Sequence, residues 1–230
     1  MKVEIWSDVM CPFCYIGKRK FENALKQFSN ADKVEIEWKS FQLDPDLVSD
    51  ASKTVHEYLA ERKGWTVDYA KQVGSQVTDM AKAEGLEYNF DKAIVANSLN
   101  AHRVSHLAKI YQLGNDLEEA LFKAYFTEGK NIADKQTLVD IAVSVGLKSD
   151  EVVEVLNSDK FLQEVEVDIL TAQKIGVRGV PFFVFDKKYA VSGAQPTDVF
   201  LGALEKTWNE SAPDLKADAS GSCTVDGDCN

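Results

Sequence analysis

Residues 7–17 read Ser-Asp-Val-Met-Cys-Pro-Phe-Cys-Tyr-Ile-Gly, and within them two residues separate Cys11 from Cys14. Residues 2–6 alternate apolar and polar side chains, which predicts a short β-strand. From Phe13 to Phe28 apolar residues recur at steps of three and four, which predicts an amphipathic helix. The cysteine pair therefore falls where a strand passes into a helix.

This position predicts a reactive pair. A sulfur at a helix N-terminus faces unpaired backbone N–H groups and the positive end of the helix dipole, which favour a thiolate. Pro12 suits the first helical turn, where its missing N–H costs nothing. Because only two residues separate the cysteines, dithiol and disulfide can interconvert with little movement. We expect the Cys11 thiolate to attack a substrate disulfide and Cys14 to resolve the mixed disulfide.

Two other interpretations of the pair stay open, namely half of a zinc site and a pair of inert buried thiols. The chain has two further cysteines, Cys223 and Cys229, so all four could bind one zinc ion. Five residues separate that second pair, a looser spacing than the two to four typical of zinc sites. In a reducing compartment two close pairs are more typical of redox or metal sites than of structural disulfides. We predict a redox pair at Cys11 and Cys14 and no metal site.

The remaining patterns place this motif in an α/β chain. Residues 34–38 alternate and predict a second strand, and residues 181–185 and 189–192 predict a hairpin. Pro196 then begins a last helix. Between about residues 50 and 175 the patterns are helical and several of them end at glycines.

The element order predicts three parts. Residues 1–48 and 172–210 should form one sheet with flanking helices, as a discontinuous domain. Residues 49–171 should be an all-helical insertion between its two halves. Residues 211–230 are rich in Ala, Asp, Ser and Gly and should be a flexible tail that carries the second cysteine pair.

Composition narrows the partners and the location. The 230 residues carry a net charge of −11, which argues against nonspecific binding to nucleic acid or anionic membranes. No run of 18 apolar residues exists, so we expect no membrane span. The first residues have no apolar signal core, and we expect a cytoplasmic protein. The oligomeric state stays open, a homodimer included.

Four stretches resemble the DsbA-like branch of the thioredoxin superfamily, and are most similar to its cytoplasmic FrnE-type dithiol–disulfide oxidoreductases. They are residues 7–17, Asn97-Ser98-Leu99-Asn100-Ala101-His102-Arg103, Gly176-Val177-Arg178-Gly179-Val180-Pro181-Phe182-Phe183 and Ser192-Gly193-Ala194-Gln195-Pro196. The resemblance implies a thioredoxin-like fold interrupted by a large helical insertion, which agrees with the element order.

The resemblance also implies a site. Cys11 would be the exposed nucleophile and Cys14 its buried partner. The Val180–Pro181 peptide would be cis and lie beside the active sulfur, so that the Val180 backbone could pair with an extended substrate. The substrate-binding residues would be Pro12, Phe13, Val180 and Pro181.

Phe13 stands where strongly oxidising DsbA proteins have histidine, so we predict a less oxidising couple. The partners would be protein or small-molecule disulfides and thiols. No cofactor is expected beyond the redox-active disulfide, with glutathione as a candidate co-substrate.

Related 2-hydroxychromene-2-carboxylate isomerases and kappa-class glutathione transferases resemble this chain but carry serine where it has Cys11. A glutathione-dependent isomerase or transferase is thus one alternative, and a redox- or zinc-regulated binding protein is another.

Two lesser signals remain. Some FrnE-type proteins have a second C-terminal cysteine pair, so Cys223 and Cys229 could exchange electrons with the first pair. A local disulfide or two idle thiols would be the simpler explanation. His102 and His106 lie one helical turn apart, and we expect both to pack in the helix interior rather than to bind metal.

Overall fold

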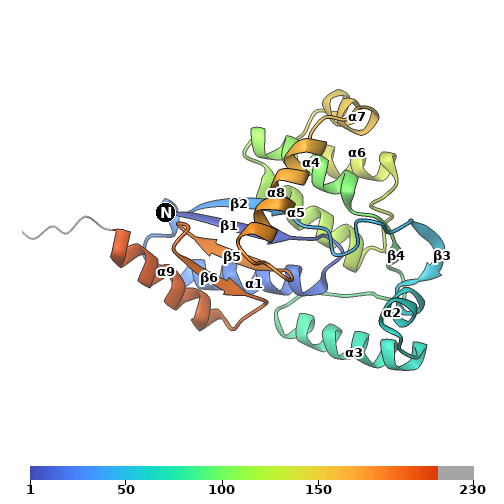
Figure 1. Ribbon diagram of the computed structural model, residues 1–230, viewed down its shortest axis with the longest axis horizontal. Coiled ribbons are helices and arrows are strands. Elements are labelled where there is room, and N and C mark those ends of the chain that lie inside the picture. The colour runs from blue at the N-terminus through green and yellow to red at the C-terminus, as the bar shows by residue number, and fades with distance from the viewer. Residues whose placement is uncertain (212–230) are drawn as a thin grey trace, which may run out of the picture.

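The computed structural model describes residues 1–211 and builds one four-stranded sheet from both ends of the chain. Its strand order is β2-β1-β5-β6, with β1 parallel to β2 and the other pairs antiparallel. The strands are β1 (Lys2–Ser7), β2 (Glu35–Ser40), β5 (Phe182–Phe185) and β6 (Tyr189–Ser192). Strands β1 and β5, far apart in sequence, therefore lie side by side (Figure 1).

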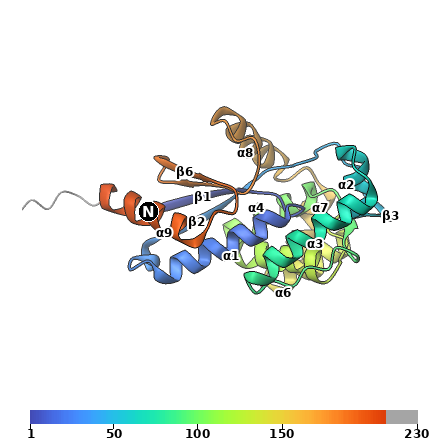
Figure 2. The same ribbon diagram turned by 90° about the horizontal axis from the view of Figure 1, so that it is seen from below.

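Helices cover both faces of this sheet (Figure 2). On one face lie α1 (Pro12–Gln27) and α9 (Thr197–Ser211), and on the other lies α8 (Leu162–Lys174). The Phe21 ring lies 5.4 Å from that of Phe183 and 5.8 Å from that of Phe200, which joins α1, β5 and α9. Large aromatic side chains of this kind contribute most of the apolar burial that holds such layers together.

Between β2 and α8 the chain forms a block of helices. They are α2 (Val55–Lys63), α3 (Val67–Ala83), α4 (Leu99–Ile110), α5 (Gly114–Phe122), α6 (Lys135–Ser144) and α7 (Ser149–Asn157). Short segments η1 (Ala31–Lys33) and η2 (Lys123–Thr127) complete the helical elements. Glu119 fixes this block to α1, since its carboxylate lies 2.6 Å from Lys18 Nζ and accepts a 2.6 Å hydrogen bond from the Tyr15 hydroxyl.

The predicted α/β architecture with a helical insertion is confirmed, but the insertion is not wholly helical. Strand β3 (Asp50–Thr54) pairs antiparallel with β4 (Ile94–Val95). The sequence did not indicate these strands because β3 reads Asp-Ala-Ser-Lys-Thr, without apolar alternation, and β4 has only two residues. The boundaries at residues 48 and 171 stay predictions.

Within residues 1–211, no helix is long and apolar enough to cross a membrane. The predicted tail lies outside the described residues except for Ser211, which ends α9.

Candidate functional site

The two cysteines lie at the junction of β1 and α1, where the sequence predicted them. Cys11 is the N-cap residue of α1, with extended φ and ψ of −88° and 111°, and Pro12 begins the helix. The Cys11 N–H donates to Asp8 O at 2.9 Å, and the Cys14 N–H donates to Cys11 O at 3.0 Å. No side chain caps this helix end, so no side-chain acceptor competes with the Cys11 sulfur for the first N–H groups of the helix.

Both cysteines are free thiols and lie 3.6 Å apart. Cys14 is fully buried, and burial raises the pKa of its thiol well above the usual value. The neighbouring Cys11 raises that pKa further, whereas the Ser7 hydroxyl and the Asp8 backbone N–H lower it. At neutral pH Cys14 therefore carries its proton and needs a base before it can attack.

The resemblance implied an exposed Cys11, and the structure corrects this, because Cys11 is only 3% exposed. The Cys11 thiol donates to Val180 O at 3.4 Å. Tyr88 of the insertion donates its hydroxyl hydrogen to Pro12 O at 2.7 Å and closes the other side. Phe13, at 38% exposed, is instead the outward-facing residue of the motif.

Sequence reasoning missed Tyr88. The Tyr88 side chain is buried, and burial raises the pKa of its hydroxyl. A charge on Cys11 or Cys14 would raise this pKa further, because Tyr88 lies beside both thiols. It belongs to a segment between α3 and α4 that has no motif of its own. The only available signal was general: a buried tyrosine hydroxyl needs a hydrogen-bond partner.

The Val180–Pro181 loop meets α1 closely beside the thiols. Its peptide bond is cis, as the resemblance implied. At Gly17 an added Cβ would lie 2.9 Å from Pro181 Cγ, so only glycine lets helix and loop approach this far. The structure thus brings together Cys11, Cys14, Pro12, Phe13, Val180 and Pro181. Cys223 and Cys229 lie outside the described residues.

The two histidines of α4 do not face a common site. His102 Nε2 lies 3.6 Å from Asp8 Oδ1, beneath the cysteines. His106 Nε2 instead lies 3.2 Å from both Asp168 Oδ2 and Ser40 Oγ. Over residues 1–211 no group of three or more His, Cys, Asp or Glu residues could hold a metal ion.

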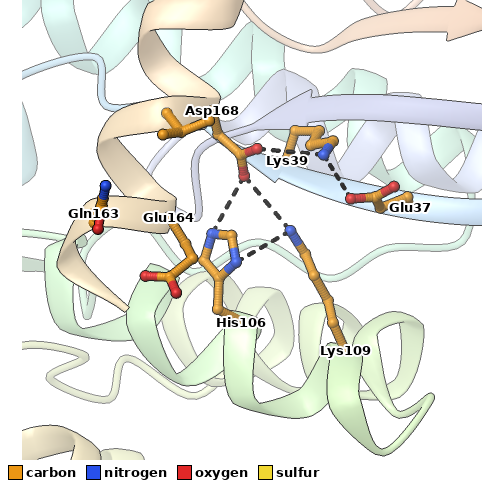
Figure 3. A pocket seen from close by; sticks show the side chains of 8 residues that line it. Glu37, Lys39, His106, Lys109, Gln163, Glu164 and Asp168 are labelled. Carbon is orange, nitrogen blue, oxygen red and sulfur yellow. Dashed lines mark hydrogen bonds and ion pairs between the residues drawn. The ribbon is translucent and has the colours of Figure 1, made fainter. Parts of the chain in front are cut away.

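His106 borders a separate pocket of about 350 Å³ between β2, α4 and α8 (Figure 3). Its lining residues are Glu37, Lys39, His106, Lys109, Gln163, Glu164, Val167 and Asp168, none of which belongs to the cysteine site. Although burial alone would raise it, the His106 hydrogen bond and the Lys109 charge hold the pKa of Asp168 at about 2. Asp168 also accepts the Ser40 N–H at 2.9 Å, so this ion cluster joins α8 and α4 to the edge of the sheet.

Comparisons with known proteins agree with this arrangement. The chain is 30% identical over 211 residues to the uncharacterized protein YwbO of Bacillus subtilis (strain 168), covering 88% of this chain and 94% of that protein. The structure of this chain superposes on that of a probable DsbA oxidoreductase, SCO1869, from Streptomyces coelicolor with a TM-score of 0.87 at 38% identity. The match covers 99% of this chain and 97% of SCO1869.

The cytosolic disulfide reductase DsbM from Pseudomonas aeruginosa shares the fold at 14% identity, with a TM-score of 0.66 over 92% of this chain and 100% of that one. The family described as the DSBA-like thioredoxin domain matches residues 2–205. The sheet assembled from both chain ends, the helical insertion and this match together show that the chain belongs to the DSBA-like thioredoxin domain family.

Proposed function

We propose that the protein is a thiol–disulfide oxidoreductase whose working group is the pair Cys11 and Cys14. The carrying observation is the geometry of the pair: two free thiols 3.6 Å apart, one at an uncapped helix N-terminus and one fully buried. The first position favours an attacking thiolate, and the second keeps the resolving thiol away from other reactants. The family and the SCO1869 likeness support the same chemistry.

The reaction takes two exchanges. The Cys11 thiolate forms a bond to one substrate sulfur, and the other substrate sulfur leaves with the electron pair of the broken disulfide. Cys14 then loses its proton and attacks the Cys11 sulfur, which releases the bound substrate sulfur as a thiolate. The substrate disulfide is reduced by two electrons, and the enzyme dithiol becomes a disulfide.

Substrates would bind along Val180–Pro181 and against Phe13. The Val180 carbonyl lies 3.4 Å from Cys11 Sγ, so a chain that pairs with this backbone would bring its disulfide to the nucleophile. The exposed Phe13 ring and the neighbouring Pro12 offer an apolar contact on the other side. Both protein and small-molecule disulfides fit this description, glutathione disulfide included, and DsbM has been solved with GSH.

Two cysteines in the motif favour dithiol exchange over a glutathione-dependent isomerase or transferase. With Phe13 in place of the histidine of strongly oxidising DsbA proteins, we propose a less oxidising couple, which suits a cytoplasmic location. A redox titration against glutathione tests this, and a strongly oxidising potential would contradict it.

The number of residues between the end of α9 and Cys223 would allow the second cysteine pair to meet the first. Helices α1 and α9 run in the same direction, since Phe28 contacts Trp208 at one end as Phe21 contacts Phe200 in the middle. Along the helix axis the 16 residues of α1 therefore place Cys11 about 24 Å from the end of α9, and packed helices lie a further ~8–10 Å apart sideways. The twelve residues 212–223 can span at most about 40 Å. We propose that Cys223 and Cys229 exchange electrons with the Cys11–Cys14 pair.

The test is reduction of insulin disulfides with dithiothreitol. Wild type should accelerate the precipitation of the insulin B chain, and Cys11→Ser should abolish the effect. Cys14→Ser should instead trap a mixed disulfide with the substrate, visible by mass spectrometry. A wild type without activity, or a Cys11→Ser variant that retains it, would overturn the proposal and point to glutathione-linked or binding chemistry.

A further inference from the structure

Three polar side chains are buried beneath the cysteines: Ser7 is 2% exposed, Asp8 0% and His102 2%. Among the described residues, Ser7 Oγ and His102 Nε2 have no hydrogen-bond partner. Leaving a buried polar group unpaired costs about 1–3 kcal/mol. Two such atoms next to a reactive thiol therefore call for an explanation beyond packing.

Ser7 and Asp8 adjoin Cys14, and Asp8 in turn faces His102 of the insertion. The Ser7 hydroxyl and the Asp8 N–H are close enough to the Cys14 sulfur to stabilise its thiolate. The Asp8 carboxylate is fixed by two backbone donors, the Met10 N–H at 3.2 Å and the Leu43 N–H at 2.7 Å. Its Oδ1 then lies 3.6 Å from His102 Nε2.

The imidazole comes from the insertion, whereas its partners come from the sheet domain. His102 lies on α4, within the stretch 97–103 that the proposed reaction does not otherwise use. Ser7 ends β1 and Asp8 follows it, so the chain that leads into the cysteine motif also carries the hydroxyl and the carboxylate.

We propose that Ser7, Asp8 and His102 form a proton-transfer group that deprotonates Cys14 in the second exchange. The inference rests on the proposed oxidoreductase function. As Cys14 attacks Cys11, His102 takes up the thiol proton and the imidazolium ion pairs with the Asp8 carboxylate, while the Ser7 hydroxyl and the Asp8 N–H stabilise the thiolate as it forms. The sulfur–sulfur bond forms between the cysteines, and the substrate sulfur leaves Cys11 with the electron pair.

A second acidic side chain lies near the imidazole of His102. Glu118 of α5 also faces His102; it accepts a 2.8 Å hydrogen bond from the Ser105 hydroxyl. Burial raises the pKa of Glu118, while His102 and, more weakly, Lys109 and Lys18 lower it.

Two tyrosines of the insertion lie near Asp8. Burial raises the pKa of both; at Tyr58 the hydrogen bond to Asp44 adds to this and the charge of Asp8 adds less, and at Tyr125 the charge of Asp8 is the second cause. Both hydroxyls are therefore neutral, and the imidazolium would pair with the carboxylate of Asp8, 3.6 Å away.

The experiment separates the two exchanges in one trace. Reduced protein in a Cys223→Ser/Cys229→Ser background is mixed with excess dithiobis(nitrobenzoate) by stopped flow. The first thionitrobenzoate reports attack by Cys11, and the second reports resolution by Cys14. His102→Gln should slow only the second phase, by about 10²- to 10⁴-fold, as loss of general base catalysis does. That phase should also rise more steeply with pH, because hydroxide must then remove the proton.

His106→Gln is the matched control, since it is a buried histidine one turn further along α4 that faces Asp168 instead. It should leave both phases unchanged. Ser7→Ala is a second test that removes no hydrogen bond seen in the structure, and it should slow the same phase.

A second phase within about twofold of wild type in both variants, or one slowed with an unchanged pH profile, overturns the inference. A wild type that releases no second thionitrobenzoate refutes the oxidoreductase function itself.

Discussion

Replacing Gly17 by alanine should weaken both stability and activity, because α1 and the Val180–Pro181 loop leave no room for a methyl group. The added Cβ would lie 2.9 Å from Pro181 Cγ and 3.5 Å from Phe183 Cζ. A proline ring cannot rotate away, so the loop itself must move. Overpacking costs about 1–3 kcal/mol, and alanine gains about 0.5–1 kcal/mol over glycine inside a helix.

The expected net loss is therefore up to about 2.5 kcal/mol, or up to roughly 10 °C in Tm for a chain of this size. Gly202→Ala is the matched control, since Gly202 lies in α9 with nothing within 4 Å of an added Cβ. It should raise stability by about 0.5–1 kcal/mol.

Thermal unfolding followed by circular dichroism measures the first effect. Insulin reduction, at a temperature where both variants are folded, measures the second. Activity should fall in Gly17→Ala because the Val180 carbonyl moves away from Cys11 Sγ. If Gly17→Ala were as stable and as active as Gly202→Ala, the close seating of the loop on α1 would be refuted.

Three further changes test other parts of the structure. Tyr88→Phe removes the donor to Pro12 O and should cost about 0.5–1.5 kcal/mol of stability. In this variant iodoacetamide should alkylate the Cys11 thiol faster, and an unchanged labelling rate would show that Tyr88 does not shield Cys11. Because the folded-state pKa of Asp168 lies at about 2, below its ordinary 3.8, the ion cluster stabilises the protein above about pH 4 and loses this effect as the pH falls towards 2. The difference in unfolding free energy between wild type and Asp168→Asn, from urea titrations, should accordingly shrink by about 2 kcal/mol over that range, and a constant difference would contradict the coupling. Cys223→Ser/Cys229→Ser should slow turnover with dithiothreitol if the pairs exchange electrons, whereas identical turnover and oxidation kinetics would end that hypothesis.

The insertion contributes directly to the site on this view. Tyr88 covers the cysteine motif, and the base we propose for the resolving thiol, His102, lies 3.6 Å from Asp8. A thioredoxin-like sheet with the same two cysteines but without the insertion would lack both groups. The helical block therefore belongs to the chemistry as well as to the stability of the fold.

The sequence by itself determined the local features. The strand before Cys11 and the helix after it follow from a change of apolar period between two neighbouring segments, which is encoded locally. The same is true of α2, where Thr54 caps the start and Gly64, with φ of 68°, ends the helix. The polar strand β3 could not be predicted, because its pairing with β4 depends on backbone hydrogen bonds rather than on apolar side chains.

Only the tertiary structure decided which distant groups meet the thiols. Val180 lies 169 residues from Cys11, and Tyr88 lies 76 residues from Pro12, so no local pattern predicts either contact. His102 and His106 have the same spacing and the same helix, yet one faces Asp8 and the other Asp168. That difference arises from how α4 packs between the sheet and α8, and packing of whole elements fixes what surrounds each side chain.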